Sequence, residues 1–269
     1  MDEPEGVGHT ANFPLQAAAV RRALRAEASP ARAAAVARFF KTGVGEYGEG
    51  DRFLGVTVPT QRTIARRFRD LPLKEADALL QSPIHEDRST ALLILVGQFV
   101  RRHTDVQLRE RIFRLYMRRL RFINNWDLVD VSAAPIIGGW LASTRALASR
   151  NARLAGHDRE NDLLVRLARS RNVWSRRVAM IATLHFTVRG DHREAIRIAT
   201  QLVNDEHDLI HKAVGWMLRE VGKRASLDAL RRFLREYAGT MPRTTLRYAI
   251  ERLPPAERAR WMRAQLECR

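Results

Sequence analysis

Apolar residues recur three and four positions apart along most of this chain, the spacing that places them on one face of an α-helix. The pattern is clear within residues 79–99, 163–167 and 196–203. Stretches that alternate between apolar and polar residues, as a half-buried strand would, are nearly absent. The sequence therefore predicts an all-α protein of about a dozen helices joined by short connections.

Prolines support this interpretation, because proline is favoured at the first position of a helix, where its missing N–H is not needed. Four prolines stand where a periodic segment begins, and we expect each to occupy the first helical position: Pro30, Pro59, Pro72 and Pro242.

Four segments of the chain resemble one another. They are HEDRSTALLILVGQF from His85, WDLVDVSAAPIIGGW from Trp126, NVWSRRVAMIATLHF from Asn172 and EHDLIHKAVGWMLRE from Glu206. Three of them carry a basic residue about four positions in, at Arg88, at Arg176 or Arg177, and at Lys212. Their spacing of roughly 35 to 47 residues is that of HEAT-type helical pairs.

The repeats predict a right-handed α-solenoid of HEAT-like helical pairs, whose inner helices line a concave basic groove suited to a long ligand. An irregular helical bundle remains the alternative. We expect residues 1–28 to form a partly flexible N-terminal segment and residues 29–269 to form a single repeat domain, because the hydrophobic content of 45% supports a sizeable core.

The charge balance points to a polyanionic partner. Lys and Arg total 47 against 30 Asp and Glu, a net charge of +17. Clustered cations bind a phosphate backbone favourably because binding releases counterions from it. Nucleic acid is therefore favoured over an acidic membrane surface. Most of the cations are arginine, whose planar fork suits phosphate.

One segment concentrates this charge: residues 101–121 hold eight arginines and two acids. On a helix, four of these arginines form one stripe, opposite an apolar side: Arg111, Arg114, Arg118 and Arg121, against Ile112, Leu115 and Phe122. Two interpretations stay open, a solvated face and a surface that contacts DNA.

Cysteine use and the chain start indicate a reducing cytosol. The single cysteine, Cys268, can form no internal disulfide and no zinc-binding thiolate cluster. The acidic start MDEPEGVGHTANF lacks the pattern of a secretion signal, and no apolar run reaches the roughly 18 residues of a spanning helix. We expect a cytoplasmic protein with no membrane partner.

The loop GVGEYG at 43–48 has the letters of a dinucleotide-binding turn, but such a turn must follow a buried strand and open a helix. Here the preceding residues predict a helix, and Glu46, Glu49 and Asp51 would repel phosphate. We interpret the glycines as a flexible crossing between two helices. His207 and His211 are spaced for a metal, yet no further ligands accompany them, so we predict no metal and no cofactor.

Four separated blocks of the chain, spanning roughly residues 30 to 225, resemble bacterial DNA alkylation repair proteins of the AlkD type. They are FFKTGVGEYGEGDRFLGVTVPTQR, NNWDLVD, NVWSRRVA and HKAVGWMLRE. The resemblance implies a HEAT-like solenoid and a DNA glycosylase that excises cationic N3- or N7-alkylated purines, with DNA in the concave groove and no base flipped into a pocket.

Trp126 and Asp130 match the catalytic tryptophan and aspartate of that family. Their i, i+4 spacing places them on one helix face. As a cationic base leaves, the sugar becomes oxocarbenium-like, and a carboxylate can stabilise that charge and orient or deprotonate water while an indole offers its π face. No general acid is needed. Asp127 also lies nearby, and a purely structural role for Asp130 in the first helical turns stays open.

The resemblance implies further site residues. Trp216 matches a second tryptophan that grips the lesion nucleotide, and Arg177 and Arg219 match arginines that contact the DNA backbone. Lys212 and Arg219 share the helix face of Trp216. Phe39 stands where a family member has tyrosine, which puts a hydroxyl contact in doubt. Trp174 is expected in the core.

The sequence thus predicts a monomeric, metal-free, monofunctional DNA glycosylase acting on double-stranded DNA that contains alkylated purines, close to the bacterial nucleoid. Asp130, Trp126 and Trp216 are its expected catalytic residues. Two alternatives are a non-catalytic solenoid that recognises distorted or branched DNA through arginine, and a protein-interaction scaffold for acidic peptides.

Overall fold

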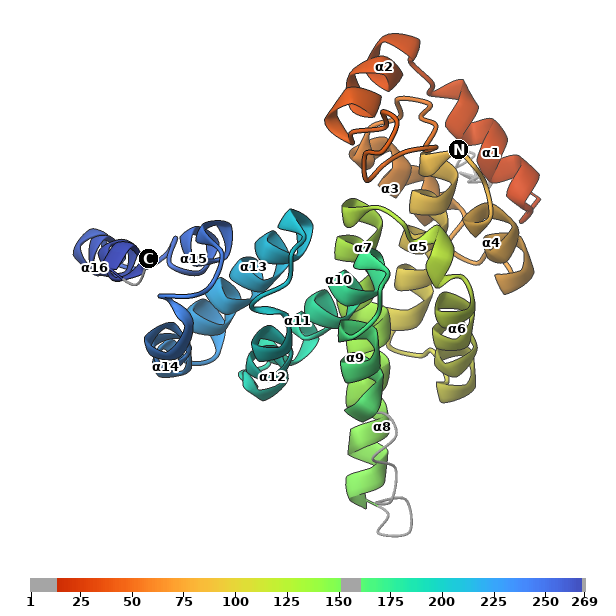
Figure 1. The fold of residues 1–269 in the computed structure, drawn as a ribbon. Helices are drawn as coiled ribbons and strands as arrows, with labels where there is room; N and C mark the ends of the chain where they lie inside the picture. Colours follow the sequence, from red (N-terminus) through yellow and green to blue (C-terminus); the bar gives the residue numbers. More distant parts are fainter. Residues whose placement is uncertain (1–13, 151–160, 268–269) are drawn as a thin grey trace, which may run out of the picture. The chain divides into compact units, whose positions relative to one another are not determined.

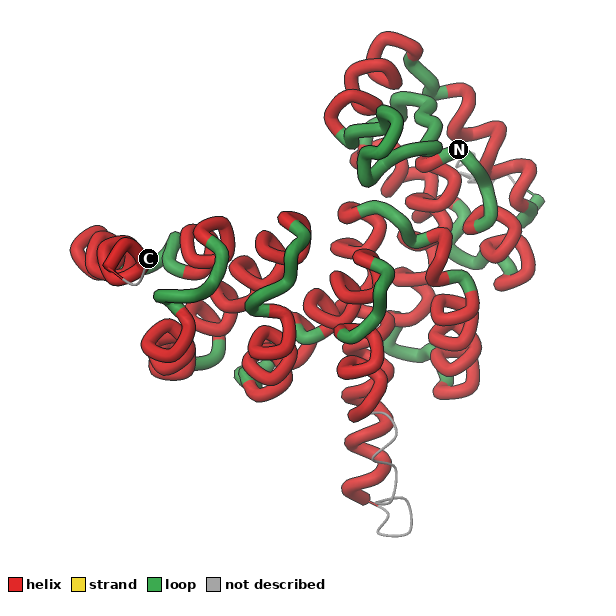
Figure 2. The backbone as a smooth tube through the Cα atoms, viewed as in Figure 1, coloured by secondary structure: helices red, strands yellow, loops and turns green. Residues whose placement is uncertain are grey.

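The computed structural model describes residues 14–150 and 161–267, and Figure 1 shows their helices. Regular secondary structure in these residues is helical throughout (Figure 2), apart from one isolated β-bridge between Arg52 and Ile84. The prediction of an all-α protein is therefore confirmed. The described residues form sixteen α-helices, more than the expected dozen, because several are short.

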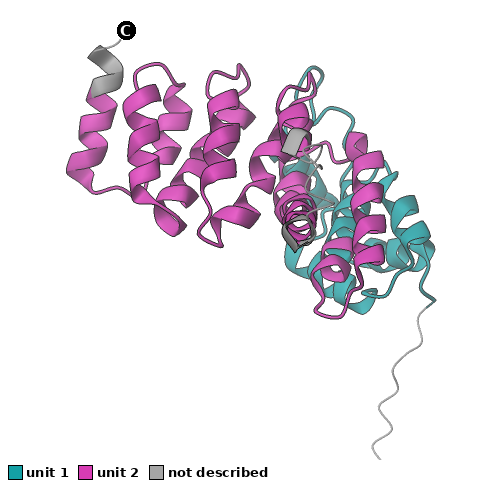
Figure 3. Cartoon of the chain, turned by 90° about the horizontal axis from the view of Figure 1, so that it is seen from below, with its two compact units in different colours: residues 1–94 teal, residues 95–269 magenta. Residues whose placement is uncertain are grey.

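The chain divides into two compact units, residues 1–94 and 95–269 (Figure 3), and the division falls within the helix His85–Val100. Unit 1 contains the following elements: α1 (Ala17–Ala26), α2 (Pro30–Phe39), α3 (Val58–Arg67), α4 (Leu73–Leu80) and the first part of α5 (His85–Val100). The expected boundary at residue 28 and the single repeat domain stay predictions.

Helix α1 lies inside the segment for which we expected partial flexibility. It packs against α3 and α4 and buries Val20 and Leu24. The Ala17 N–H donates to Glu75 Oε2 at 2.9 Å, which ties the start of α1 to α4. Residues 17–26 thus form part of the packed unit, and residues 1–13 lie outside the described residues.

Unit 2 contains the rest of α5 and a long series of short helices. They are α6 (Val106–Arg118), η1 (Leu120–Phe122), α7 (Trp126–Ser132), the π-helical η2 (Ala133–Gly138), α8 (Gly139–Arg150), α9 (Asn161–Ala168), α10 (Val173–Ala182), α11 (Leu184–Thr187), α12 (Arg193–Leu202), α13 (Asp208–Arg224), α14 (Leu227–Tyr237), α15 (Arg243–Ala249) and α16 (Pro255–Glu267).

Packing within unit 2 follows the chain. Helices α7, α10, α13 and α15 pack in succession, each against the next (Figure 1). Helix α9 packs against α10 and α12, and α13 packs against both α12 and α14. Neighbouring helical pairs therefore stack along the chain, an arrangement consistent with an α-solenoid.

The repeated blocks begin helices as predicted, and polar residues cap several of them. Asn172 Oδ1 accepts N–H bonds from Trp174 and Ser175 at 2.9 and 3.0 Å, and Asn125 Oδ1 accepts from the Trp126 N–H at 2.8 Å. Such caps satisfy backbone donors that the first helical turn leaves open.

The basic residues near the block starts fasten neighbouring loops. Arg88 lies 2.5 Å from Asp51, and Arg176 lies 2.6 Å from Asp205. Arg176 also donates to the carbonyls of Ser170 and Arg171. These two arginines therefore hold neighbouring segments of the fold together.

The glycine-rich loop connects α2 to α3, which confirms the predicted crossing between helices. The Gly43 N–H donates to Glu46 Oε2 at 2.8 Å, and the Gly45 N–H donates to Glu49 Oε2 at 2.9 Å. Gly45 has a φ of +77°, which favours glycine. Two acids of this loop thus serve as acceptors for its own backbone.

The four prolines lie close to their predicted places. Pro30 is the first residue of α2 and Pro59 is the second of α3, while Pro72 and Pro242 immediately precede α4 and α15. The start of each helix was thus predicted to within one residue.

The π-helical η2 follows from Pro135, which has no N–H to donate and would clash with the preceding turn of an α-helix. The Gly139 N–H donates to the Ala134 carbonyl, five residues earlier. A Cβ on Gly138 would lie 2.3 Å from the Ala182 carbonyl oxygen, so glycine there lets η2 approach α10 and α11 closely.

Among the described residues, none of the helices combines the length and apolarity needed to cross a lipid bilayer. Cys268, on which the expectation about disulfides and thiolate clusters rests, lies outside the described residues.

Candidate active site on α7, α10 and α13

Helix α7 carries Trp126 as its first residue and Asp130 one turn later. The two side chains therefore share a face, as the sequence predicts. Both residues are partly exposed, whereas Leu128 and Val129 between them are buried. The apolar residues anchor α7 in unit 2 and leave the tryptophan and the carboxylate on its accessible side.

The Asp130 carboxylate is bound by the guanidinium of Arg177 on α10. Arg177 Nε donates to Oδ1 and Arg177 Nη2 donates to Oδ2, each at 2.8 Å. Arg177 Nη1 donates to the Leu209 carbonyl of α13 at 2.5 Å. One buried arginine thus joins α7, α10 and α13 and fixes the orientation of the carboxylate.

The Asp130 side chain keeps some exposure despite this pair. The Asp130 side chain is 19% exposed, against 6% for Arg177. A carboxylate has about four lone-pair positions, and the guanidinium occupies two of them. Asp130 can therefore accept a further hydrogen bond from a water molecule while it stays paired with Arg177.

Burial raises the pKa of Asp130 above its ordinary value, because a charge is poorly solvated there. The positive charge of Arg177 and its hydrogen bonds oppose this rise, whereas the negative charge of Asp127 adds to it. Asp127 itself accepts the Leu128 N–H at 2.8 Å. Arg177 is thus the group that favours the ionised form of Asp130.

Helix α13 carries Trp216, which is partly exposed, between Lys212 and Arg219. Lys212 pairs with Asp208 at 2.6 Å, and Arg219 pairs with Glu251 and lies 3.6 Å from Glu220. The two cations of this face are therefore partly neutralised by acids, with which a DNA phosphate would compete.

The structure gives Arg177 a different setting from the one expected of a DNA-backbone contact. Three of its nitrogens donate to Asp130 and Leu209, and its side chain is buried. Any phosphate contact would compete with these bonds. The sequence contains both members of the pair, but they are 47 residues apart, and no local spacing reveals the contact.

Phe39 is the last residue of α2 in unit 1, is 66% exposed, and makes an edge contact with Phe40 at a centroid distance of 5.3 Å. Its expected contact with DNA stays a prediction. Trp174 on α10 is 6% exposed, so its expected place in the core is confirmed.

A contact beneath α7 was not predicted. The hydroxyl of the fully buried Tyr116 lies 3.1 Å from Ser132 Oγ, which donates to the Leu128 carbonyl at 2.5 Å. Burial raises the pKa of Tyr116. Tyr116 lies on the apolar face of the arginine-rich segment, together with Ile112 and Leu115. That apolar pattern is the signal that could have identified its burial.

The two histidines with metal-ligand spacing serve the fold. His207 Nδ1 accepts the Leu209 N–H at 3.1 Å, and His211 Nε2 contacts the Asp205 carbonyl. In the part of the chain that the structure describes, no group of three or more His, Cys, Asp or Glu side chains is placed to hold a metal ion.

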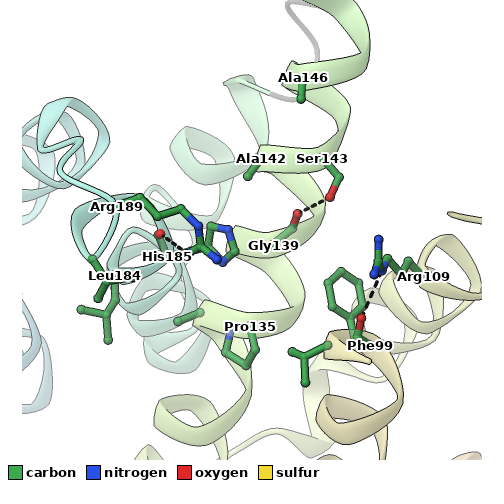
Figure 4. Close-up of a pocket in the computed structure, with 13 residues that line it drawn as sticks. Phe99, Arg109, Pro135, Gly139, Ala142, Ser143, Ala146, Leu184, His185 and Arg189 are labelled. Carbon is green, nitrogen blue, oxygen red and sulfur yellow. Dashed lines mark hydrogen bonds between the residues drawn. The ribbon is translucent and has the colours of Figure 1, made fainter. Parts of the chain in front are cut away.

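An open cavity of about 620 Å³ lies elsewhere in unit 2 (Figure 4). Its lining is largely apolar and includes Phe99, Pro135, His185 and Arg189. Burial lowers the pKa of His185 to about 4, so its ring is neutral at pH 7. Neither tryptophan of the candidate site nor Asp130 lines this cavity.

Comparisons with known proteins show which family the chain resembles. A family model described as DNA alkylation repair enzyme matches residues 20–253. A solved structure described as a predicted DNA alkylation repair enzyme from Enterococcus faecalis has a TM-score of 0.63 and 16% sequence identity, and the match covers 85% of this chain and 98% of that one. That likeness concerns the fold. A sequence comparison with curated proteins finds no match.

Proposed function

Because the chain belongs to the DNA alkylation repair enzyme family, we propose that it is a monofunctional DNA glycosylase that hydrolyses the N-glycosidic bond of cationic N3- or N7-alkylated purines in duplex DNA. In this proposal the fold is a right-handed HEAT-like solenoid, and the duplex lies in its concave face without flipping a base. The protein acts as a monomer, on DNA in the bacterial cytoplasm.

The observation that carries the proposal is the accessible carboxylate of Asp130, oriented by Arg177 and placed one turn from Trp126. An alkylated purine carries a positive charge and leaves as a neutral base, so no acid has to protonate it. The sugar becomes positively charged as the bond to C1′ stretches, and a fixed carboxylate stabilises that charge.

Each residue has a distinct part in the reaction. Asp130 faces the developing sugar cation and accepts a proton from the attacking water, which then bonds to C1′. Trp126 and Trp216 offer the π faces of their indoles to the cationic nucleotide. Arg177 is a positioning residue, which holds both oxygens of Asp130.

The remaining contacts of the proposal are with the DNA backbone. Lys212 and Arg219, on the same face as Trp216, bind phosphates in exchange for their acid partners. Phe39 contributes apolar contact with the backbone.

The decisive measurement is release of 7-methylguanine or 3-methyladenine from alkylated duplex DNA by the native chain and by Asp130→Asn. Native protein is expected to release the base and the variant to be strongly impaired. Asp127→Asn is the matched control, because it removes the same charge three residues away. Full activity in Asp130→Asn, or an equal loss in both variants, would contradict the mechanism.

A second candidate function rests on the same ion pair. If the bond between Asp130 and Arg177 serves only to hold α7 against α10, the protein binds distorted or branched DNA without cleaving the glycosidic bond. Native protein that binds alkylated duplex but releases no base above the uncatalysed rate would favour this alternative.

A further inference from the structure

Helix α6 presents an arginine stripe that the proposed active site does not use. Arg111, Arg114 and Arg118 are exposed, and Arg121 continues the series over the ring of Phe122, 4.7 Å away. The other side of α6 buries Ile112, Leu115 and Tyr116 in unit 2. The helix is therefore firmly anchored, and its cationic side faces solvent.

Most of this charge is not neutralised. Arg114 pairs with Glu110 at 2.5 Å, but Arg111 and Arg118 have no ion pair with any residue that the structure describes. The setting contrasts with Arg176 and Arg177, which are bound on several sides. Exposed cations without internal acids are free to bind an external anion.

The arginine stripe lies on the exposed side of α6, opposite the side that contacts the end of α7. Asp130 points to Arg177 on α10, whereas Ser132 contacts Tyr116 on α6. Ser132 is two positions after Asp130, so their side chains diverge by about 160° around the helix. The buried side of α6 thus contacts the end of α7 through Tyr116 and Ser132, and its arginines lie on the opposite, exposed side.

We propose that the α6 stripe is a second binding surface for a nucleic-acid phosphate backbone, separate from the one beside Asp130. A duplex held there leaves the carboxylate open to another duplex, so one molecule binds two DNA segments. The inference rests on the proposed function only in taking DNA as the polyanion.

The geometry favours a phosphate backbone over a lipid surface. A membrane-surface helix inserts its apolar side into the lipid, but the apolar side of α6 is buried in unit 2. Arg111 and Arg118 are seven residues apart, which separates them by about 10 Å along the helix axis. Two cations at that spacing on flexible stems can bind successive phosphates of one strand.

The test is capture of a second duplex. Full-length protein is bound to an immobilised alkylated duplex, and capture of a dye-labelled, lesion-free duplex is measured across a salt series. The variant is Arg111→Gln with Arg118→Gln. The matched control is Arg232→Gln with Arg235→Gln, an equal charge change at two exposed arginines of α14.

Native protein and the α14 control are expected to capture the second duplex. In the α6 variant the log-log salt slope of capture falls by about 2, one for each lost phosphate contact. Release of the alkylated base from the immobilised duplex stays unchanged. Absence of capture by native protein, or an equal loss in the α14 control, overturns the inference.

Two further outcomes separate this inference from the proposed function. If native protein releases no base but only the α6 variant loses capture, the glycosylase proposal fails and the second surface stands. If the α6 variant loses binding to vesicles that contain anionic lipid and keeps duplex capture, the surface is a lipid surface, and the inference is wrong.

Discussion

Two aspartate–arginine pairs, one in each unit, differ in how far water reaches the carboxylate. In unit 1, Asp51 binds Arg88 at 2.5 Å and His85 at 3.2 Å, and all three side chains are at most 4% exposed. In unit 2, Asp130 binds Arg177 at 2.8 Å and keeps 19% of its side chain exposed. A carboxylate sealed from water can only hold the fold, whereas one open on a single side can also meet a substrate.

The largest expected effect is on stability, and it distinguishes the pair in unit 1 from the pair in unit 2. Asp51→Ala leaves the buried Arg88 charge uncompensated, and we expect the free energy of unfolding to fall by about 3–5 kcal/mol. Urea denaturation measures this loss. Asp70→Ala serves as control, since Asp70 is 55% exposed beside Arg69 and its loss should change stability by about 1 kcal/mol or less. Equal effects at the two sites would contradict the structural role of Asp51.

For activity, the larger effect is expected at Asp130 and not at Asp51. In the proposed mechanism, Asp130→Asn removes the charge that stabilises the sugar cation, and we expect base release to slow by roughly 100-fold or more. Its stability loss should be smaller than that of Asp51→Ala, because water reaches Asp130. Single-turnover release of 7-methylguanine and thermal unfolding measure the two effects. A variant that loses stability but keeps its rate would make Asp130 structural like Asp51.

The pH dependence sharpens the comparison further. Because burial raises the pKa of Asp130, its ionised form is lost as pH falls through a range above the ordinary carboxyl value. Base release should fall over that range. Arg177→Met removes the charge that favours ionisation, so the midpoint should move to higher pH.

Arg177→Lys keeps the positive charge but not the bidentate contact with Asp130. It should move the midpoint of the pH dependence less than Arg177→Met does. Circular dichroism checks that both variants are folded. An unchanged midpoint in Arg177→Met would show that this arginine does not control ionisation of Asp130.

The smallest expected effect is on stability and concerns Tyr116, whose hydroxyl contacts Ser132 at the end of α7. Tyr116→Phe removes the hydroxyl next to Ser132, and we expect a loss of about 1 kcal/mol in the free energy of unfolding. Ser132 keeps its bond to the Leu128 carbonyl, so base release should change little. Urea denaturation and the release assay provide the two readings. A large rate loss with unchanged stability would assign Tyr116 to the site.

Local features of this molecule were predictable because they depend on residues close in sequence. The shared face of Trp126 and Asp130 follows from helix periodicity, and the burial of Trp174 and Ile112 follows from the apolar pattern. The loop between α2 and α3 was recognisable because its flanks read as helices.

Contacts between helices far apart in sequence were not predictable in the same way. The bonds from Arg177 to Asp130 and Leu209 depend on how α7 and α13 pack against α10, and these partners are 47 and 32 residues away. Of the neighbours Arg176 and Arg177, one fastens a loop and the other holds the carboxylate. Composition and spacing do not distinguish these two arginines, so the sequence alone could not assign their different contacts.

Arg177 also makes the proposed reaction sensitive to the spacing of three helices. A guanidinium is rigid and planar, so it cannot keep its bonds to α7 and α13 at full strength if either helix shifts on α10. A change in how α7 or α13 packs on α10 would therefore rotate the carboxylate. Even a substitution that only moves the Leu209 carbonyl would therefore be expected to slow the proposed reaction.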